Sequence, residues 1–202
     1  MGKQRAREYL EQVNKDGKVL EYTLFQPGLF LDYLAFPHRT AKHVAPLQTV
    51  FDFHNCRAIV VDGHEDAAIT FTSASDLAGV VARAVDYDGE WPSIGGMRGN
   101  RSTFAELLEI GARVRGRPFS VEKVKLEDLE AGKLETSWLL GERHKSLSEE
   151  QAAAIAKQVT VGMLLSSVKG AWDVSDGMSR LFPDYKFKGI EEFLAGVWGG
   201  KP

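Results

Sequence analysis

The chain has 202 residues, of which 44% are hydrophobic, and this is enough for one sizeable core in an ordinary globular protein. The balance of 25 Lys and Arg against 28 Asp and Glu leaves a net charge of −3, which gives no electrostatic reason to expect a nucleic acid as a partner. A single cysteine, Cys56, rules out a disulfide within the chain and fits a reducing compartment.

The first predicted element is an amphipathic helix over 5–14, where apolar residues recur at helical spacing. A strand rich in Tyr, Thr, Leu and Phe is predicted over 20–26. It should end at about Gln26, because Pro27 cannot donate a ladder hydrogen bond and Gly28 admits backbone geometries that a side chain would forbid.

This strand end is the place where the sequence predicts a ligand. In open α/β sheets, ligands bind just beyond the carboxyl ends of strands, which points to residues 27–30. The alternative interpretation is an ordinary core strand with a turn after it. A helix followed by such a strand is also half of a βαβ unit whose first strand is missing.

The middle of the chain predicts an irregular loop and then two strands. The loop, over 35–56, is expected to lie over a site. The strands, 57–61 and 67–72, are separated by the turn residues 62–66 and are predicted to form a hairpin. A helix capped by Ser73 or Ser75 follows.

The remaining predicted elements follow from periodicity and from capping residues. They are a short strand at 93–97, a helix opened by Ser102 or Thr103 and ending near Gly116, a strand at 119–125, a short helix at 126–130, a long helix from Leu147 to about Ser167 with Ser148 as cap, and a last amphipathic helix at 190–198. The longest uncharged apolar runs are far shorter than the roughly 20 residues that span a bilayer, so we expect a cytoplasmic protein with no membrane partner.

Few residues carry a recognisable chemical motif. The segment 95–100 is rich in glycine but matches neither standard phosphate-loop spacing, so a turn is the better interpretation. The five histidines include no metal-binding pair, and no metal site is predicted; they are His38, His43, His54, His64 and His144. His38 and His43 are candidates for lining a pocket.

Lys3 is the titratable residue that stands out. It lies one turn before the helix that leads into the strand at 20–26, so its side chain can point into the same cleft as residues 27–30. Considered alone, it would be interpreted as a surface lysine.

Taken together, Gly2-Lys3 followed by 6–10, and then 22–30, resemble the NmrA-like and isoflavone-reductase-like family of atypical short-chain dehydrogenases/reductases. Further stretches that look like this family are 69–72, 75–78, 181–185 and 190–194. The resemblance covers nearly the whole chain, and the order and spacing of the stretches are more specific than any one of them.

The resemblance implies an α/β fold, namely the C-terminal part of a Rossmann-like NAD(P)-binding fold with a smaller α/β substrate domain. It implies a single NmrA-like domain over 1–202 that is incomplete, because the glycine-rich fingerprint and the first Rossmann βα units would lie upstream. By the same resemblance Lys3 is the catalytic general acid or base. Pro27, Gly28 and Phe30 match the segment beside the nicotinamide of NADP or NAD.

The function implied is an NAD(P)H-dependent reductase of a small-molecule substrate, here in a truncated form that carries the substrate-binding half. The alternative is a non-catalytic regulator of the NmrA type, which senses a dinucleotide and binds a protein partner. The choice between NADP and NAD stays open, because the residues that discriminate them would lie upstream.

Overall fold

The computed structural model describes residues 2–141 and 148–201. The strands are β1 (Leu24–Gln26), β2 (Leu29–Phe30), β3 (Phe51–Asp52), β4 (Arg57–Val61), β5 (Ala68–Thr72), β6 (Ile94–Gly96), β7 (Asn100–Thr103) and β8 (Ser120–Val124). The helices are α1 (Lys3–Val13), α2 (Ala74–Val85), α3 (Phe104–Arg115), α4 (Leu126–Glu130), α5 (Glu149–Val168) and α6 (Ile190–Trp198), with 3-10 turns at Leu31–Ala35 and Ser179–Leu181.

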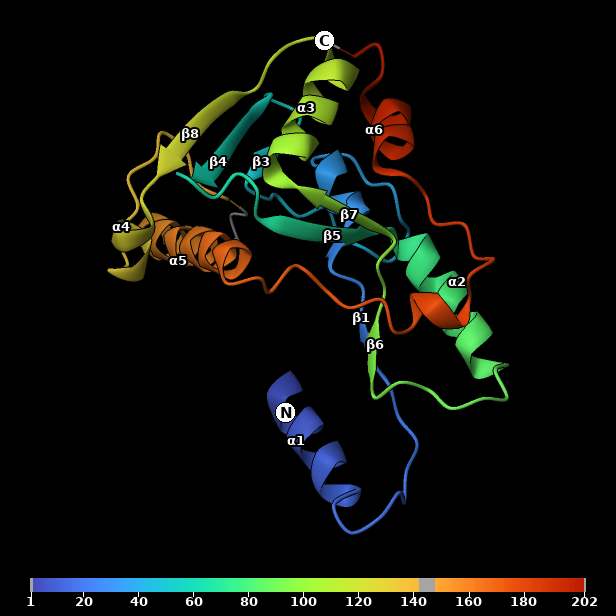
Figure 1. The fold of residues 1–202 in the computed structure, drawn as a ribbon. Coiled ribbons are helices and arrows are strands. Elements are labelled where there is room, and N and C mark those ends of the chain that lie inside the picture. The colour runs from blue at the N-terminus through green and yellow to red at the C-terminus, as the bar shows by residue number, and fades with distance from the viewer. Residues whose placement is uncertain (1, 142–147, 202) are drawn as a thin grey trace.

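Helix α1 stands apart from the body of the protein, next to the paired strands β1 and β6 (Figure 1). It confirms the predicted N-terminal helix, but none of its residues is buried. Strand β1 begins at Leu24 rather than at residue 20. The side chain of Asn14 explains the late start, since its Oδ1 accepts the amides of Val19 and Leu20 and holds that segment in a turn.

The bend at Pro27-Gly28 divides one extended segment between two neighbours. Before the bend, β1 pairs in parallel with β6; after it, β2 pairs in parallel with β5. The predicted end of the strand at Gln26 is therefore confirmed. The bend moves the chain from the two-stranded β1-β6 sheet to the three-stranded β2-β5-β7 sheet.

The predicted hairpin of the strands at 57–61 and 67–72 is wrong. Both strands exist, but β4 pairs with β3 and β8, whereas β5 pairs with β2 and β7. The turn between them carries the chain from one sheet to the other. Four of the five residues in each strand are buried, and a strand so enclosed is typical of a sheet interior with a neighbour on each side.

The helices agree with the sequence in their caps. Ser73 caps α2, Thr103 and Glu106 form a capping box at α3, and Gly116 ends α3 in the left-handed conformation. Ser148 caps α5, as predicted, while the predicted start at Leu147 lies outside the described residues. Strand β7 was not predicted, because its residues are polar and carry no strand signal.

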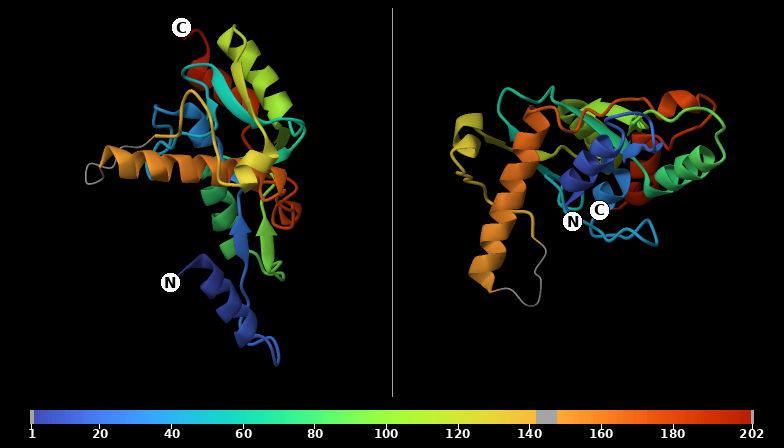
Figure 2. Two further views of the ribbon diagram at one scale, coloured as in Figure 1. Left: turned by 90° about the vertical axis from the view of Figure 1, so that its left-hand side faces the viewer. Right: turned by 90° about the horizontal axis from the view of Figure 1, so that it is seen from below.

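The main core lies where α3, α6 and the first 3-10 turn cover β4 and β5. A smaller cluster sits beneath α2 and includes Val80, Met97 and Met178. Helix α5 projects away from the sheets (Figure 2). No helix in the described part of the chain is long and apolar enough to cross a membrane.

Candidate functional site

The bend at Pro27-Gly28 requires a glycine at its second position. Gly28 has φ +70°, and a Cβ placed there would lie 2.2 Å from the carbonyl oxygen of Thr70. Any other residue would meet both the left-handed backbone and the adjacent strand β5. The glycine therefore lets β1 and β2 join two sheets at close range.

Phe30 follows the bend and remains only partly buried. Its backbone pairs with Thr72 of β5, and its ring meets the ring of Tyr33 edge-on at 5.6 Å. The hydroxyl of Thr72 donates to the carbonyl of Met97 at 3.1 Å, which ties β5 to the segment after β6. One side of the Phe30 ring is thus held by Tyr33.

A hollow of about 540 Å³ lies between α1 and β1. It is lined by Lys3, Gln4, Ala6, Arg7, Thr23, Leu24, Phe25 and Gln26. Lys3 and Gln26, the residue just before the bend, therefore share one space. Pro27, Gly28 and Phe30 do not line this hollow, so the structure brings Lys3 to the edge of the bend rather than onto it.

Strand β1 has an unpaired edge beside the same hollow. Its only sheet neighbour in the described part of the chain is β6. Leu24 donates its amide to Ser93, and Gln26 accepts the amide of Met97. Because successive residues of a strand point their polar groups to opposite sides, the amide and carbonyl of Phe25 point away from β6.

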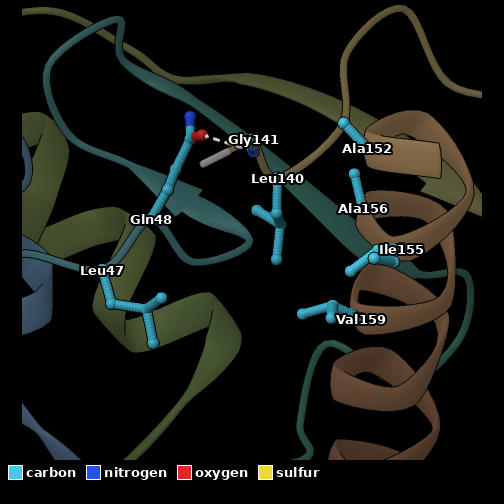
Figure 3. A pocket seen from close by; sticks show the side chains of 8 residues that line it. All are labelled: Leu47, Gln48, Leu140, Gly141, Ala152, Ile155, Ala156 and Val159. Atoms are coloured by element: carbon cyan, nitrogen blue, oxygen red, sulfur yellow. Dashed lines mark hydrogen bonds between the residues drawn. The ribbon is translucent and has the colours of Figure 1, made fainter. Parts of the chain in front are cut away.

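A second pocket, of about 130 Å³, opens between the loop over 36–50 and α5 (Figure 3). It is lined by Leu47, Gln48, Leu140, Gly141, Ala152, Ile155, Ala156 and Val159. The predicted loop over 35–56 thus contributes one wall of a pocket. Among the residues of 2–141 and 148–201 that line it, every side chain apart from Gln48 and the glycine is apolar.

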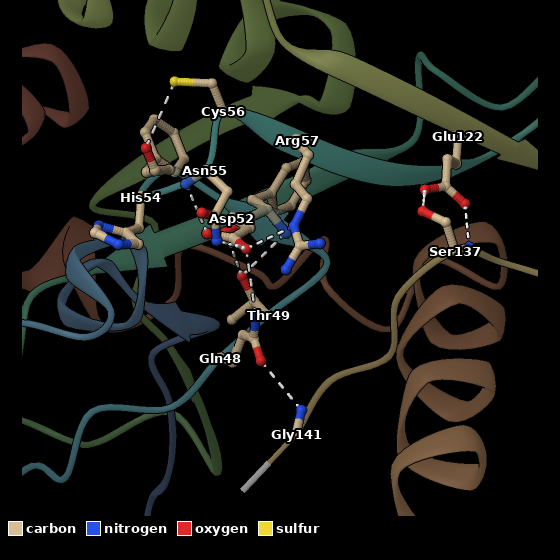
Figure 4. A network of polar contacts seen from close by, with 12 residues as sticks. Gln48, Thr49, Asp52, His54, Asn55, Cys56, Arg57, Glu122, Ser137 and Gly141 are labelled. Atoms are coloured by element: carbon tan, nitrogen blue, oxygen red, sulfur yellow. Dashed lines mark hydrogen bonds and ion pairs between the residues drawn. The ribbon is translucent and has the colours of Figure 1, made fainter. Parts of the chain in front are cut away.

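A polar network around Asp52 supports the loop side of this pocket (Figure 4). Asp52 is buried and accepts hydrogen bonds at 2.8 Å from Asn55 Nδ2 and from Arg57 Nε. Burial would raise the pKa of Asp52, but the hydrogen bonds from Asn55 and Arg57 outweigh it and hold that pKa below its ordinary value. The guanidinium of Arg57 also lies 4.3 Å from the ring centre of Trp138.

Gln48 connects this network to the opposite wall. Its Oε1 accepts the amide of Gly141 at 3.1 Å, and its Nε2 donates to Asp52 Oδ2 at 3.4 Å. Near the other end of the same segment, Ser137 donates its amide and its hydroxyl to Glu122. The segment from 137 to 141 is therefore held at both ends.

His38 and His43, the candidates for lining a pocket, line neither of the two hollows described above. His38 packs against Trp198 with ring centres 5.1 Å apart, and His43 is exposed. His144 lies outside the described residues. Within residues 2–141 and 148–201, no three His, Cys, Asp or Glu side chains gather as metal ligands.

Sequence reasoning missed Gln48, Asp52, Arg57 and Trp138. Gln48 and Gly141 are 93 residues apart in the chain, and no motif spacing connects them. The sequence offered one weak indication of these residues, which is a long loop with polar residues directly before a buried strand.

Comparisons with known proteins place this geometry in context. No protein-family model matches the chain. The chain is 24% identical over 182 residues to oxidoreductase swnN of Metarhizium robertsii, covering 89% of this chain and 52% of that protein. It is 23% identical over 201 residues to oxidoreductase swnN of Arthroderma benhamiae, covering 89% of this chain and 62% of that protein. The chain thus spans about half to three-fifths of the length of these relatives.

Solved structures show the same fold. AtPrR2 with NADP+ and (+)pinoresinol aligns with a TM-score of 0.61 at 14% identity, over 96% of this chain and 55% of that one. A ternary complex of leucoanthocyanidin reductase from Vitis vinifera aligns with a TM-score of 0.57 at 18% identity, over 97% and 60%. An isoflavone reductase aligns with a TM-score of 0.59 at 14% identity, over 96% and 56%. The α/β fold with parallel strands, expected from the sequence, is confirmed.

Proposed function

We propose that the chain is the substrate-binding part of an NAD(P)H-dependent reductase of the NmrA-like and isoflavone-reductase-like family of atypical short-chain dehydrogenases/reductases. In this proposal residues 1–202 form one domain that is completed by dinucleotide-binding βα units. The observation that carries the proposal is the hollow in which Lys3 meets β1 directly before the bend at Pro27-Gly28.

Lys3 would serve as the general acid or base of the reaction. Lys3 lines the hollow beside the strand that ends at the bend, and a ligand of an α/β sheet is expected near such a strand end, so its ammonium group could donate a proton there. When bound, NADPH or NADH would supply the hydride. Lys3 would give or take the proton at the substrate atom next to the atom that receives the hydride.

The residues at the bend suit the nicotinamide end of such a cofactor. Gly28 lets the bend lie directly against Thr70 of β5, and the partly buried Phe30 that follows would offer ring surface to a planar group. The phosphates of the dinucleotide have no glycine-rich βα turn in this chain to hold them. The unpaired edge of β1 is where further parallel strands carrying that turn would add.

The proposal is tested by supplying the dinucleotide-binding half. The N-terminal part of oxidoreductase swnN of Metarhizium robertsii is fused ahead of Lys3, and NADPH oxidation is followed with cyclic enones and aromatic ketones. We expect turnover that falls at least about a hundredfold in Lys3→Ala, which is the scale of losing a general acid. Lys15→Ala, at an exposed lysine just after α1, is the matched control and should keep full activity. If Lys3→Ala turns over as fast as that control, the assignment of Lys3 is wrong.

A regulator that senses a dinucleotide and binds a protein partner is the second candidate. It is favoured by the composition of the hollow, since none of the described residues that line it beside Lys3 is a His, Tyr, Asp or Glu. A fusion that binds NADPH, turns over no substrate and retains a specific partner in a pull-down would support this candidate. Turnover with no partner recovered would count against it.

A further inference from the structure

We propose that a cluster of basic side chains around Trp198 binds a small oxyanion, the phosphate or sulfate group of a ligand. The basic cluster consists of four exposed residues, His38, His54, Arg117 and Lys201. It shares no residue with the hollow beside Lys3. The proposal therefore goes beyond the reductase function and does not depend on it.

The indole of Trp198 brings three of these groups together. The ring centre of His38 lies 5.1 Å from that of Trp198, and the ring centre of His54 lies 6.1 Å from it. The ammonium of Lys201 lies 5.5 Å from the same indole centre, which is within the range of a cation–π contact. Three groups that carry or can take up a positive charge thus surround one buried side chain.

A buried guanidinium fixes two members of the cluster relative to each other. Arg115, at the end of α3, is 7% exposed. It donates from Nη1 to the carbonyl of Lys201 at 3.0 Å and from Nη2 to the carbonyl of His54 at 3.3 Å. The turn after β3 and the segment after α6 are therefore held side by side before any ligand arrives, which lowers the cost of ordering them on binding.

Arg117 adds a cation beside the same turn. Its Nε donates to Cys56 Sγ at 3.0 Å, and Arg115 Nε donates to the same sulfur at 3.3 Å. A guanidinium has five N–H groups, and the other N–H groups of Arg117 have no hydrogen-bond partner among the described residues. They can donate to the oxygens of an anion with the charge-assisted geometry that guanidinium groups favour.

No acidic side chain balances the basic cluster. Across residues 2–141 and 148–201, no carboxylate forms an ion pair with any of its four members. Partial desolvation, then the charge of Lys201, then that of His54 hold the pKa of His38 below its ordinary value. The members of the cluster therefore repel one another, although the chain as a whole has a net charge of −3. A bound anion would relieve this repulsion.

The composition of the cluster favours a doubly charged oxyanion. Lys201 and Arg117 are charged at neutral pH, and the two imidazoles add charge when they take up protons. In Figure 4 the ring of His54 takes no part in the polar network around Asp52. Phosphate and sulfate groups offer several acceptor oxygens and up to two negative charges, so they can meet donors from separate elements. A carboxylate offers one charge and fewer oxygens.

Sulfate is the first probe, because it stays doubly charged at both pH values of the test. The full chain is titrated with sodium sulfate at constant ionic strength, and NMR follows the imidazole rings of His38 and His54 and the backbone amide of Lys201. We expect saturable shifts at all three, with binding about tenfold tighter at pH 5.5 than at pH 8.0, since each protonated imidazole contributes about threefold. Bound sulfate should also raise the pKa of His38, because a nearby anion favours the protonated ring.

Substitutions assign the binding to the cluster. Lys201→Gln should weaken sulfate binding about threefold, and His38→Gln combined with His54→Gln should abolish its pH dependence. Both changes keep the backbone carbonyls that Arg115 holds. Lys15→Gln removes the same charge at an exposed lysine next to α1, which stands apart from the body of the protein, and should bind as the unaltered chain does. Equal affinities in Lys201→Gln and Lys15→Gln would overturn the proposal.

Phenyl phosphate and inorganic phosphate then distinguish the source of the anion. Tighter binding of the ester would assign the site to the phosphate group of an organic molecule, and equal binding would assign it to the free ion. If sulfate moves the signals of His38 and His54 no more than chloride does at the same ionic strength, the cluster binds no oxyanion. These measurements use the chain alone, so an inactive reductase fusion would leave them unaffected.

Discussion

The backbone of Gly28 lies so close to Thr70 that a Cβ at position 28 would come within 2.2 Å of the Thr70 carbonyl oxygen. This contact joins the bend after β1 to the middle of strand β5. The nearest obstacles to a side chain at position 28 are the backbone carbonyl atoms of Thr70. No change of rotamer can move them aside.

Gly28→Ala should therefore destabilise the protein well beyond the effect of backbone conformation alone. Gly63→Ala is the matched control, since Gly63 has φ +74° and open space around it. Urea unfolding should show a loss of about 1–2 kcal/mol for Gly63→Ala and at least about 2 kcal/mol more for Gly28→Ala, in the range of overpacking. Equal losses would mean that the close approach to Thr70 is not a constraint.

The ion pair of Asp52 and Arg57 should contribute far more to the free energy of unfolding than an exposed ion pair does. The Asp52 side chain is 1% exposed, so Arg57→Leu would leave a buried carboxylate without its cation and should cost about 3–5 kcal/mol in the free energy of unfolding. Arg113→Leu is the control, because Arg113 and Glu191 are both more than half exposed; it should cost less than about 1 kcal/mol. Chemical denaturation at pH 7 would separate the two, and similar costs would contradict the prediction.

The stability of the protein should fall as the pH drops below neutrality. His38 is exposed, but its ring packs beside Trp198, and partial desolvation there, then the charge of Lys201, then that of His54 lower its pKa. Because the side chain is exposed, solvent screening keeps the effect on stability small. The unfolded chain then takes up a proton at His38 more readily than the folded chain does. Stability is complete above the ordinary histidine pKa of about 6.5 and is lost as the pH falls through the lower folded value.

Unfolding midpoints at pH 7.5 and pH 5.0 measure this loss. His38→Gln should reduce the difference between the two conditions. His43→Gln, at another exposed histidine of the same loop, is the matched control. If both variants behave alike, another group controls the pH dependence.

Removal of α1 should cost little stability. None of its residues is buried, so deletion of residues 2–13 should shift the thermal midpoint by only a few degrees, as expected for a loss below about 1 kcal/mol. A collapse of the cooperative transition would show that α1 supports the core. The same deletion removes Lys3, so the truncated chain also serves as an inactive reference for the fusion.

Sequence reasoning succeeded where local chemistry decides the structure. Ser73, Thr103, Gly116 and Ser148 set helix ends through side-chain caps or a left-handed backbone, and Pro27 ended its strand for the lack of an amide hydrogen. Sequence reasoning failed where the structure depends on residues far apart in the chain. The partners of β4 and β5 are chosen by burial against strands far along the chain, which the turn between them does not reveal.

The site divides along the same line. Lys3 and the bend could be located from sequence because they lie close together in the chain and resemble a known family; their roles stay predictions. The pocket between the loop over 36–50 and α5 could not be located from the sequence. Gln48 and Gly141 on its walls are 93 residues apart, and the polar network beside it depends on the burial of Asp52.

The eight described residues that line the pocket between the loop over 36–50 and α5 all come from loops or from α5, and none from a strand. Substitutions there can reshape the pocket without disturbing the hydrogen-bonded ladders of the sheets. Related chains can therefore differ in the shape of this pocket while keeping the same architecture.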